Sequence, residues 1–159
     1  MKASLQIRGF DNLDQAILEE LQANGRVSVA DLARKIHLSQ PAVHNRIKRL
    51  EREGIIQQYV ALLDHEQIGY DMLAFIQLTL SQHDRTLSKA LLNLIENQVR
   101  VLECHQLTGE ADLLLKVVAE NRRALAEVVT KLSECEDVQR VQTSLVLDSH
   151  KSTTQLSLD

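Results

Sequence analysis

The 159-residue sequence contains one proline, two cysteines, no tryptophan and only 3% aromatic residues, whereas hydrophobic residues make up 44%. Its cores must therefore be packed with Leu, Val, Ile and Ala. Cys104 and Cys135 form no CxxC pair, so we expect free thiols and no disulfide. No apolar run approaches the ~20 residues of a membrane-spanning helix, and the N-terminus shows no signal-peptide pattern. These absences predict a soluble, cytoplasmic protein.

Patterns for metal binding and catalysis are also lacking. None of the histidines lies in an HxxxH or paired Cys/His spacing; they are His37, His44, His65, His83, His105 and His150. The spacing Gly109-x-x-Asp112 is too short for a nucleotide-binding loop. No Ser/His/Asp set can be argued from spacing. We therefore expect no metal, no cofactor and no enzymatic activity.

The charge is distributed unevenly along the chain. The net charge is −4, but residues 1–60 carry nine Lys/Arg against seven Asp/Glu, and residues 61–159 carry nine against fifteen. The first part is therefore at +2 and the second at −6. This division predicts a DNA-binding unit attached to an acidic body that does not contact phosphate.

Residues 28–54 read as two helices joined by a tight turn. Ser28 and Ser39 are suitable N-caps, and Pro41 lies in the first turn of the second helix, where a missing N–H costs nothing. Gly54 supplies a left-handed residue after that helix. A preceding helix over about 13–23 completes a unit of three helices.

The second of these helices has the face expected of a recognition helix. Val43, Ile47 and Leu50 form its buried stripe, and the opposite side is basic and amide-bearing. Such side chains can bond guanine or adenine edges and phosphates in the major groove. We predict that DNA is contacted by Ser39, Gln40, His44, Asn45, Arg46, Lys48 and Arg49.

The residues from Phe10 to Leu63 resemble the N-terminal domain of the Lrp/AsnC (feast/famine) transcriptional regulators. Phe10-Asp11-Asn12-Leu13-Asp14 is similar to the opening of the family pattern L-D-x-x-D-x-x-I-L-x-x-L, with Phe in place of Leu. The later matches follow in the family's order at Gly25, Leu32-Ala33, Leu38-Ser39, Leu50-Glu51 and Gly54-Ile55-Ile56. Many members have proline directly after the Leu-Ser pair, whereas here Gln40 intervenes.

The second half repeats a strand–helix–strand pattern. The expected elements are strand 73–81, helix 87–95, strand 99–107, strand 112–119, helix 122–134 and strand 138–147. The order βαββαβ predicts a ferredoxin-like sheet, and the overall class is α+β. The expected domains are a helix-turn-helix domain over 10–54, a linker strand and turn over 55–72, and a ferredoxin-like domain over 73–156. The polar tail from Ser149 is a candidate for a further short edge strand.

A ferredoxin-like sheet has helices on one face only. The other face needs a cover, and we expect a second copy of the chain to supply it. We assign the alternating Ile76, Leu78 and Leu80 to this uncovered face. A two-fold dimer would also place two recognition helices against neighbouring half-sites on DNA. The minimum unit is then a homodimer, and higher homo-oligomers are expected.

This half resembles the effector-binding (RAM) domain of the same family. The run from Leu107 to Lys116 is similar to the family's [T/S]-G-x-x-D-x-x-x-K hairpin, and Val141 and Thr143 correspond to two threonines that many members carry on the last strand. The resemblance implies an amino-acid effector site at a subunit interface. Its expected residues are Thr108, Gly109, Glu110, Asp112, Val141, Thr143 and Leu145.

Together these patterns predict a sequence-specific DNA-binding transcriptional regulator that responds to a small molecule, with an amino acid as the expected effector. Two alternatives stay open. Sirohaem decarboxylases resemble the family in both halves, but an enzyme has no need of the basic recognition helix. The chain could also be an amino-acid-sensing partner protein without a DNA target of its own.

Overall fold

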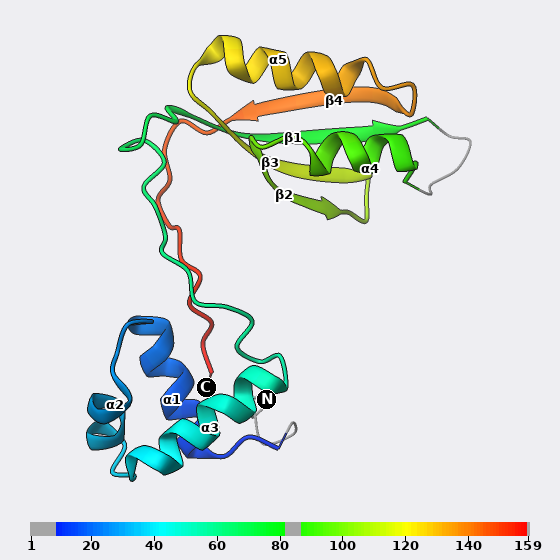
Figure 1. The fold of residues 1–159 in the computed structure, drawn as a ribbon. Coiled ribbons are helices and arrows are strands. Elements are labelled where there is room, and N and C mark those ends of the chain that lie inside the picture. Colours follow the sequence, from blue (N-terminus) through cyan, green and yellow to red (C-terminus); the bar gives the residue numbers. More distant parts are fainter. Residues whose placement is uncertain (1–8, 82–86, 159) are drawn as a thin grey trace. The chain divides into compact units, whose positions relative to one another are not determined.

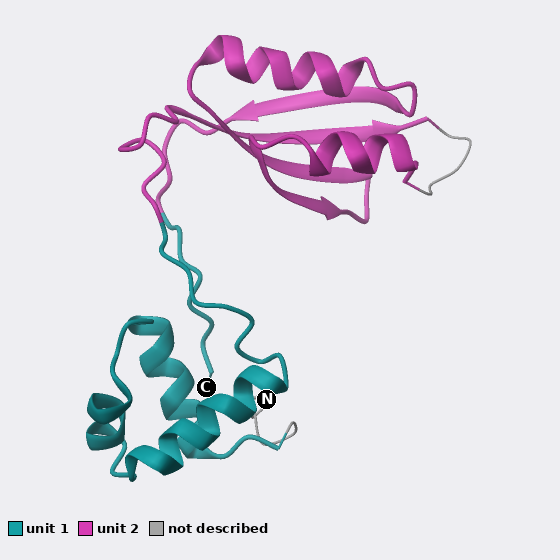
Figure 2. Cartoon of the chain, in the orientation of Figure 1, with its two compact units in different colours: residues 1–62, 151–159 teal, residues 63–150 magenta. Residues whose placement is uncertain are grey.

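The computed structural model describes residues 9–81 and 87–158, and these residues form two compact units. The first unit is Met1–Leu62 with Lys151–Asp159, and the second is Leu63–His150 (Figure 2). The chain therefore crosses between the units twice. Residues 151–156 lie in the expected domain over 73–156, and by their contacts they group with the first unit.

The first unit contains helices α1 (Asn12–Ala23), α2 (Val29–Lys35) and α3 (Gln40–Arg52) (Figure 1). Each helix begins at a side-chain cap, because the first N–H groups of a helix have no partner within it. Asp11 and Asp14 form a capping box at α1, Ser28 accepts from the Asp31 N–H, and Ser39 accepts from the Ala42 N–H at 3.3 Å. The helix-turn-helix pattern predicted from sequence is confirmed.

The core of this unit is aliphatic, apart from Phe10. It is formed by Phe10, Ile17, Leu18, Leu32, Ala33, Val43 and Leu50. His37 has φ 56° in the turn between α2 and α3, and Gly54 has φ 71° after α3. Both residues adopt the left-handed conformation that turns the chain away from a helix end, as expected for Gly54. Packing and turn together fix α3 on the other two helices.

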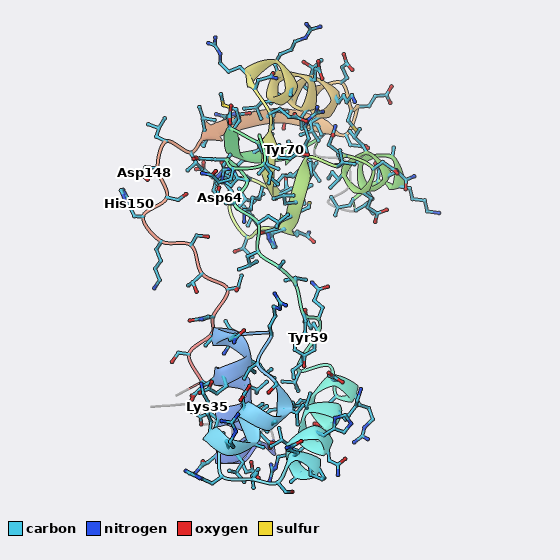
Figure 3. All side chains as sticks on the ribbon, turned by 60° about the vertical axis from the view of Figure 1, so that its left-hand side comes forward. Lys35, Tyr59, Asp64, Tyr70, Asp148 and His150 are labelled. Atoms are coloured by element: carbon cyan, nitrogen blue, oxygen red, sulfur yellow. The ribbon has the colours of Figure 1, made fainter. Side chains whose placement is uncertain are left out.

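The linker after α3 differs from the prediction. Residues 55–71, in the region where we expected a linker strand and turn over 55–72, are described without any strand. Ile56 packs against the core of the first unit. The Tyr59 side chain (labelled in Figure 3) donates its hydroxyl hydrogen to Glu51 of α3 at 3.2 Å. The β-rich composition was misleading because a strand also needs a neighbouring strand for its N–H and C=O groups. The edge strand expected after Ser149 is absent from the described residues 149–158 for the same reason.

The second unit is a four-stranded antiparallel sheet with two helices. Its elements are β1 (Met72–Leu80), α4 (Lys89–Glu96), β2 (Val101–Gln106), β3 (Leu113–Ala119), α5 (Arg122–Ser133) and β4 (Val138–Leu145). The strand order is β2-β3-β1-β4. This order and the sequence of elements confirm the ferredoxin-like βαββαβ prediction and the α+β class.

Our assignment of the uncovered sheet face was wrong. Ile76, Leu78 and Leu80 are buried and pack in one core with side chains of both helices, such as Leu91 of α4 and Val128 of α5. Alternation along β1 shows which residues share a face but not which face is covered. The opposite side of β1 carries Phe75, Gln77 and Thr79, since neighbouring residues of a strand point to opposite faces.

Among the described residues, no helix has the length and apolar character needed to cross a membrane.

Candidate DNA interface and effector site

Helix α3 presents an exposed polar surface. His44, Asn45 and Lys48 are exposed, as are Ser39 and Gln40 at its start. Val43 and Leu50, on the other side, are fully buried. Ser39 accepts a hydrogen bond from the Ala42 N–H and thereby caps α3. The first turn of α3 lies at the surface, where the positive end of the helix dipole favours an anion. Side chains on this surface can reach bases and phosphates.

Arg46 and Arg49 point to a different partner. Asp14 of α1 is 1% exposed, and its carboxylate receives Arg46 Nη1 at 2.8 Å. Arg49 Nη2 contacts the other oxygen of the same carboxylate. Arg46 also contacts Asp11 at 2.8 Å. The structure therefore places these two predicted DNA contacts in ion pairs that hold α3 on α1.

The ion-pair cluster consists of Asp11, Asp14, Arg46 and Arg49. The Asp14 N–H and the Arg46 guanidinium, which both bond the Asp11 carboxylate, lower the pKa of Asp11. The Asp14 carboxylate raises the pKa of Arg46, with a smaller contribution from Asp11. A buried carboxylate is costly unless it is paired, so the two arginines compensate for the burial of Asp14. Arg49 Nε is buried without a hydrogen-bond partner in the described part of the chain.

The sequence carries a signal for this cluster that the helix pattern alone does not reveal. Asp14 lies on the same helical stripe as the apolar Ile17, Leu18 and Leu21, at spacings of three, four and seven residues. An acidic side chain on an apolar stripe is rarely buried without a cationic partner. The Arg46 and Arg49 side chains, one turn apart on α3, are suitable partners.

Other basic side chains on and near α3 are also paired with acidic residues. Arg34 pairs with Asp31 within α2, and Lys35 Nζ lies 2.6 Å from Glu20 of α1. Lys48 has a longer contact of 3.4 Å with Glu51, and its side chain is 64% exposed. Because that pair is exposed and loose, little free energy is needed to separate it. Lys48 can therefore exchange Glu51 for a phosphate.

The turn between β2 and β3 is anchored by Asp112. Its N–H donates to the Leu78 carbonyl at 2.9 Å, and its Oδ2 accepts from the Leu80 N–H at 2.8 Å. Asp112 thus holds the last residues of β1. Gly109 has φ 140°, a conformation that L side chains rarely adopt. Thr108, Gly109 and Glu110 are exposed.

The predicted effector residues of β4 lie further along the sheet. Val141 pairs with Leu78, Thr143 with Ile76 and Leu145 with Ala74. Ile76, the partner of Thr143, is four positions along β1 from Leu80, which the Asp112 carboxylate holds. At the usual rise of a strand these four positions span roughly 13 Å. Val141 packs against the core. One chain therefore does not bring the turn and Thr143 or Leu145 together.

Two units with different roles define the class of protein. A helix-turn-helix with an exposed polar α3 is linked to a ferredoxin-like domain. Residues 10–57 match the model of a winged helix-turn-helix DNA-binding family, and residues 73–156 match the Lrp/AsnC ligand binding domain. The chain belongs to the Lrp/AsnC family of transcriptional regulators.

Similar proteins support this assignment over nearly the whole chain. The leucine-responsive regulatory protein of Rhizobium meliloti is 34% identical, covering 94% of this chain and 96% of the relative. The HTH-type transcriptional regulator FL11 of Pyrococcus furiosus is 30% identical, with coverages of 94% and 98%. A transcriptional regulator of Neisseria meningitidis, solved as its L-Met complex, has a TM-score of 0.86 at 34% identity, with coverages of 94% and 97%. AsnC of E. coli has a TM-score of 0.84 at 29% identity, with coverages of 92% and 97%.

These relatives decide between a transcriptional regulator and an enzyme. The relatives are DNA-binding regulators, so the chain is a transcriptional regulator and not an enzyme of the sirohaem-decarboxylase type. Within the described residues, no cluster of three or more His, Cys, Asp or Glu side chains is arranged to hold a metal ion. His83 lies outside these residues.

The buried carboxylate gives a test of the first unit. Asp14→Asn leaves Arg49 without a charged partner and Arg46 with Asp11 alone. Breaking a buried pair in this way should destabilise the unit by about 3 kcal/mol. Asp31→Asn, which opens the exposed pair with Arg34, is the matched control and should cost less than about 1 kcal/mol. Urea unfolding followed by helix signal measures both. Equal, small effects would show that the Asp14 pairs do not hold α3 in place.

Proposed function

We propose that this regulator binds DNA as a homodimer in the cytoplasm and that a free amino acid modulates its assembly or DNA binding. The observation that carries the DNA part is the exposed surface of α3, with Asn45 and Lys48 at its centre. The amino-acid part is supported by the Neisseria regulator, which was solved with L-Met.

The ion pairs divide the predicted DNA residues into two groups. Ser39, Gln40, His44, Asn45 and Lys48 are exposed, and we propose that they contact DNA. Arg46 and Arg49 have side chains that are 25% and 35% exposed, and both contact Asp14. Their proposed role is to position α3, with any DNA contact limited to the part of each guanidinium that stays exposed. Asn45 can bond an adenine edge, whereas Lys48 acts as a point charge for phosphate.

This division predicts different effects for two single substitutions. Lys48→Ala should weaken binding to all sequences alike. It should also reduce the slope of log K against log salt by about 1, the contribution of one phosphate contact. Asn45→Ala should instead relax the preference at one base position, with a loss of about 1–3 kcal/mol of discrimination. Titrations of promoter DNA at several salt concentrations measure both effects. Arg123→Ala, at the exposed start of α5 and 92% exposed, is the control.

Wild-type binding by both the Lys48 and Asn45 variants would contradict the proposed DNA face. Failure of the wild-type chain to bind promoter DNA at low salt would favour the partner-protein alternative.

A dimer is proposed through the uncovered sheet face. This face carries Phe75, which is 37% exposed, and the polar neighbours Gln77 and Thr79. Glu103 of β2 contacts Lys116 of β3 at 3.0 Å and His105 at 3.1 Å, and these contacts lower the pKa of Glu103. A second sheet packed on this face would bury the Phe75 ring beside a satisfied polar cluster. Higher assemblies of dimers are part of the proposal.

Sedimentation tests the dimer and the face that forms it. At low micromolar concentration the wild type should sediment at twice the chain mass of 18.0 kDa or at a multiple of that dimer mass. Phe75→Glu places a charge in the proposed interface and should yield monomer. Leu92→Glu, at a residue of α4 with nearly the same exposure, should leave the dimer intact. A wild-type monomer, or equal behaviour of both variants, would contradict the proposed interface.

The effector site is proposed between subunits, around residues 108–112. The exposed backbone near Gly109 can receive a carboxylate, and Glu110 or the second oxygen of Asp112 can pair with an ammonium group. Because one chain keeps this turn apart from Thr143 and Leu145, a site that uses both needs a second copy. Val141 packs against the core but is only partly buried, and its place in the proposed site, where a hydroxyl residue is common, favours an apolar side chain on the effector.

Thermal-shift measurements with each of the twenty amino acids test this site, because a ligand that binds only the folded state raises the midpoint. At least one apolar amino acid should stabilise the wild type. Asp112→Asn keeps an acceptor for the Leu80 N–H but removes the charge, and Glu110→Gln removes the neighbouring charge. We expect one of them to abolish the shift, with Glu127→Gln of α5 as control. Retention of the full shift in both variants would locate the site elsewhere.

A further inference from the structure

The last residues of the chain pack on the DNA-binding unit. Leu158 is partly buried and packs against the core of that unit. Two residues earlier, the Leu156 N–H donates to Gln22 Oε1 at 2.7 Å, and its carbonyl accepts from Gln22 Nε2 at 3.1 Å. Gln155 Nε2 donates to the Gln22 carbonyl at 3.2 Å. Residues 155–158 thus bond Gln22, near the end of α1, and pack on the core.

These contacts are specific but weak. The Gln22 amide pairs with both backbone groups of one residue, as a neighbouring strand would, so the register of the segment is fixed. All three hydrogen bonds are exposed to solvent, where each contributes little net stability. A single partly buried leucine supplies the apolar contact. Such a segment can dock and detach without unfolding the unit.

Because of its position in the chain, this segment connects the two units a second time. It follows β4, whose last anchor to β1 is the hydrogen bond from the Val146 N–H to the Leu73 carbonyl at 2.8 Å. The linker leaves α3 by a separate route, fixed by Ile56 and Tyr59. The DNA-binding unit is therefore attached to the second unit covalently through the linker, and again through the docked C-terminal segment. Two attachments leave a unit less freedom than one.

We propose that residues 155–158 form a detachable clasp that restricts the motion of the DNA-binding unit while docked on α1. Release of the clasp leaves the unit held by the linker alone. For the DNA-binding function proposed above, on which this consequence rests, the docked clasp favours simultaneous binding of two half-sites. A restrained unit loses less freedom when the second half-site is bound.

The test compares two leucines of the same segment in the full-length protein. Leu158→Ala removes the side chain that packs on the core, and the Leu156 amide should then exchange about tenfold faster with solvent. Leu156→Ala is the matched control, since the Leu156 side chain is 73% exposed and only its backbone takes part. Gln22→Ala should act like Leu158→Ala. Gln15→Ala, whose side chain bonds Glu19 on the same helix, should act like the wild type.

Two readouts need no DNA. Hydrogen exchange at Leu156 reports docking, and ¹⁵N relaxation of α1–α3 reports the mobility of the DNA-binding unit. Faster exchange together with faster tumbling of this unit, in Leu158→Ala and not in Leu156→Ala, is the expected result. The proposal is overturned if the wild-type Leu156 amide exchanges as in a free peptide, if both leucine variants behave alike, or if release leaves mobility unchanged.

DNA binding is the third readout. Leu158→Ala should weaken binding to a pair of half-sites by roughly threefold to tenfold and leave binding to one half-site unchanged. Equal affinity of both leucine variants for paired half-sites would overturn the role in DNA binding. If the wild type binds no DNA, the proposed function fails, while exchange and relaxation still decide whether the clasp exists.

Discussion

The buried carboxylate of Asp14 is the constraint on which the DNA-binding unit depends. It lies in an aliphatic core, and it is stable there because Arg46 and Arg49 from α3 contact its two oxygens. The same pairs fix the rotation of α3 about its own axis on α1. Rotation of α3 decides which side chains face solvent, and the exposed side chains include His44, Asn45 and Lys48. A polar interaction inside the unit thereby selects the surface that is offered to DNA.

The second unit follows from a different constraint. Its two helices cover one face of the sheet, so Ile76 and Leu78 form a core and Phe75 is left on the other face. The proposed dimer covers that face, and the proposed effector site needs a second copy because Asp112 and Thr143 lie apart along the sheet. Asp112 also caps β1, so ligand contact at this turn would act directly on the end of a central strand.

Much of this architecture was predictable from local patterns. The caps at Ser28 and Ser39, the left-handed Gly54 and the order of the six elements of the second unit all follow from residue type and spacing. The errors arose where a partner far away in the sequence decides the outcome. The alternation of Ile76 and Leu78 does not reveal the covered face, and the basic pattern of α3 does not reveal that Asp14 engages two of its arginines. Docking of Leu158 on the core of the first unit has no local signature at all.

The central claim is that α3 meets DNA through its exposed polar side chains while Arg46 and Arg49 stay bound to Asp14. Side-chain NMR of the complex with promoter DNA tests it most directly. The account predicts that the Asn45 amide and the Lys48 ammonium signals shift on binding, whereas the Arg46 and Arg49 guanidinium signals and the Asp14 carboxylate signal stay as in the free protein. Loss of the Asp14 contacts in the complex, with both guanidinium groups bonded to DNA, would contradict the account.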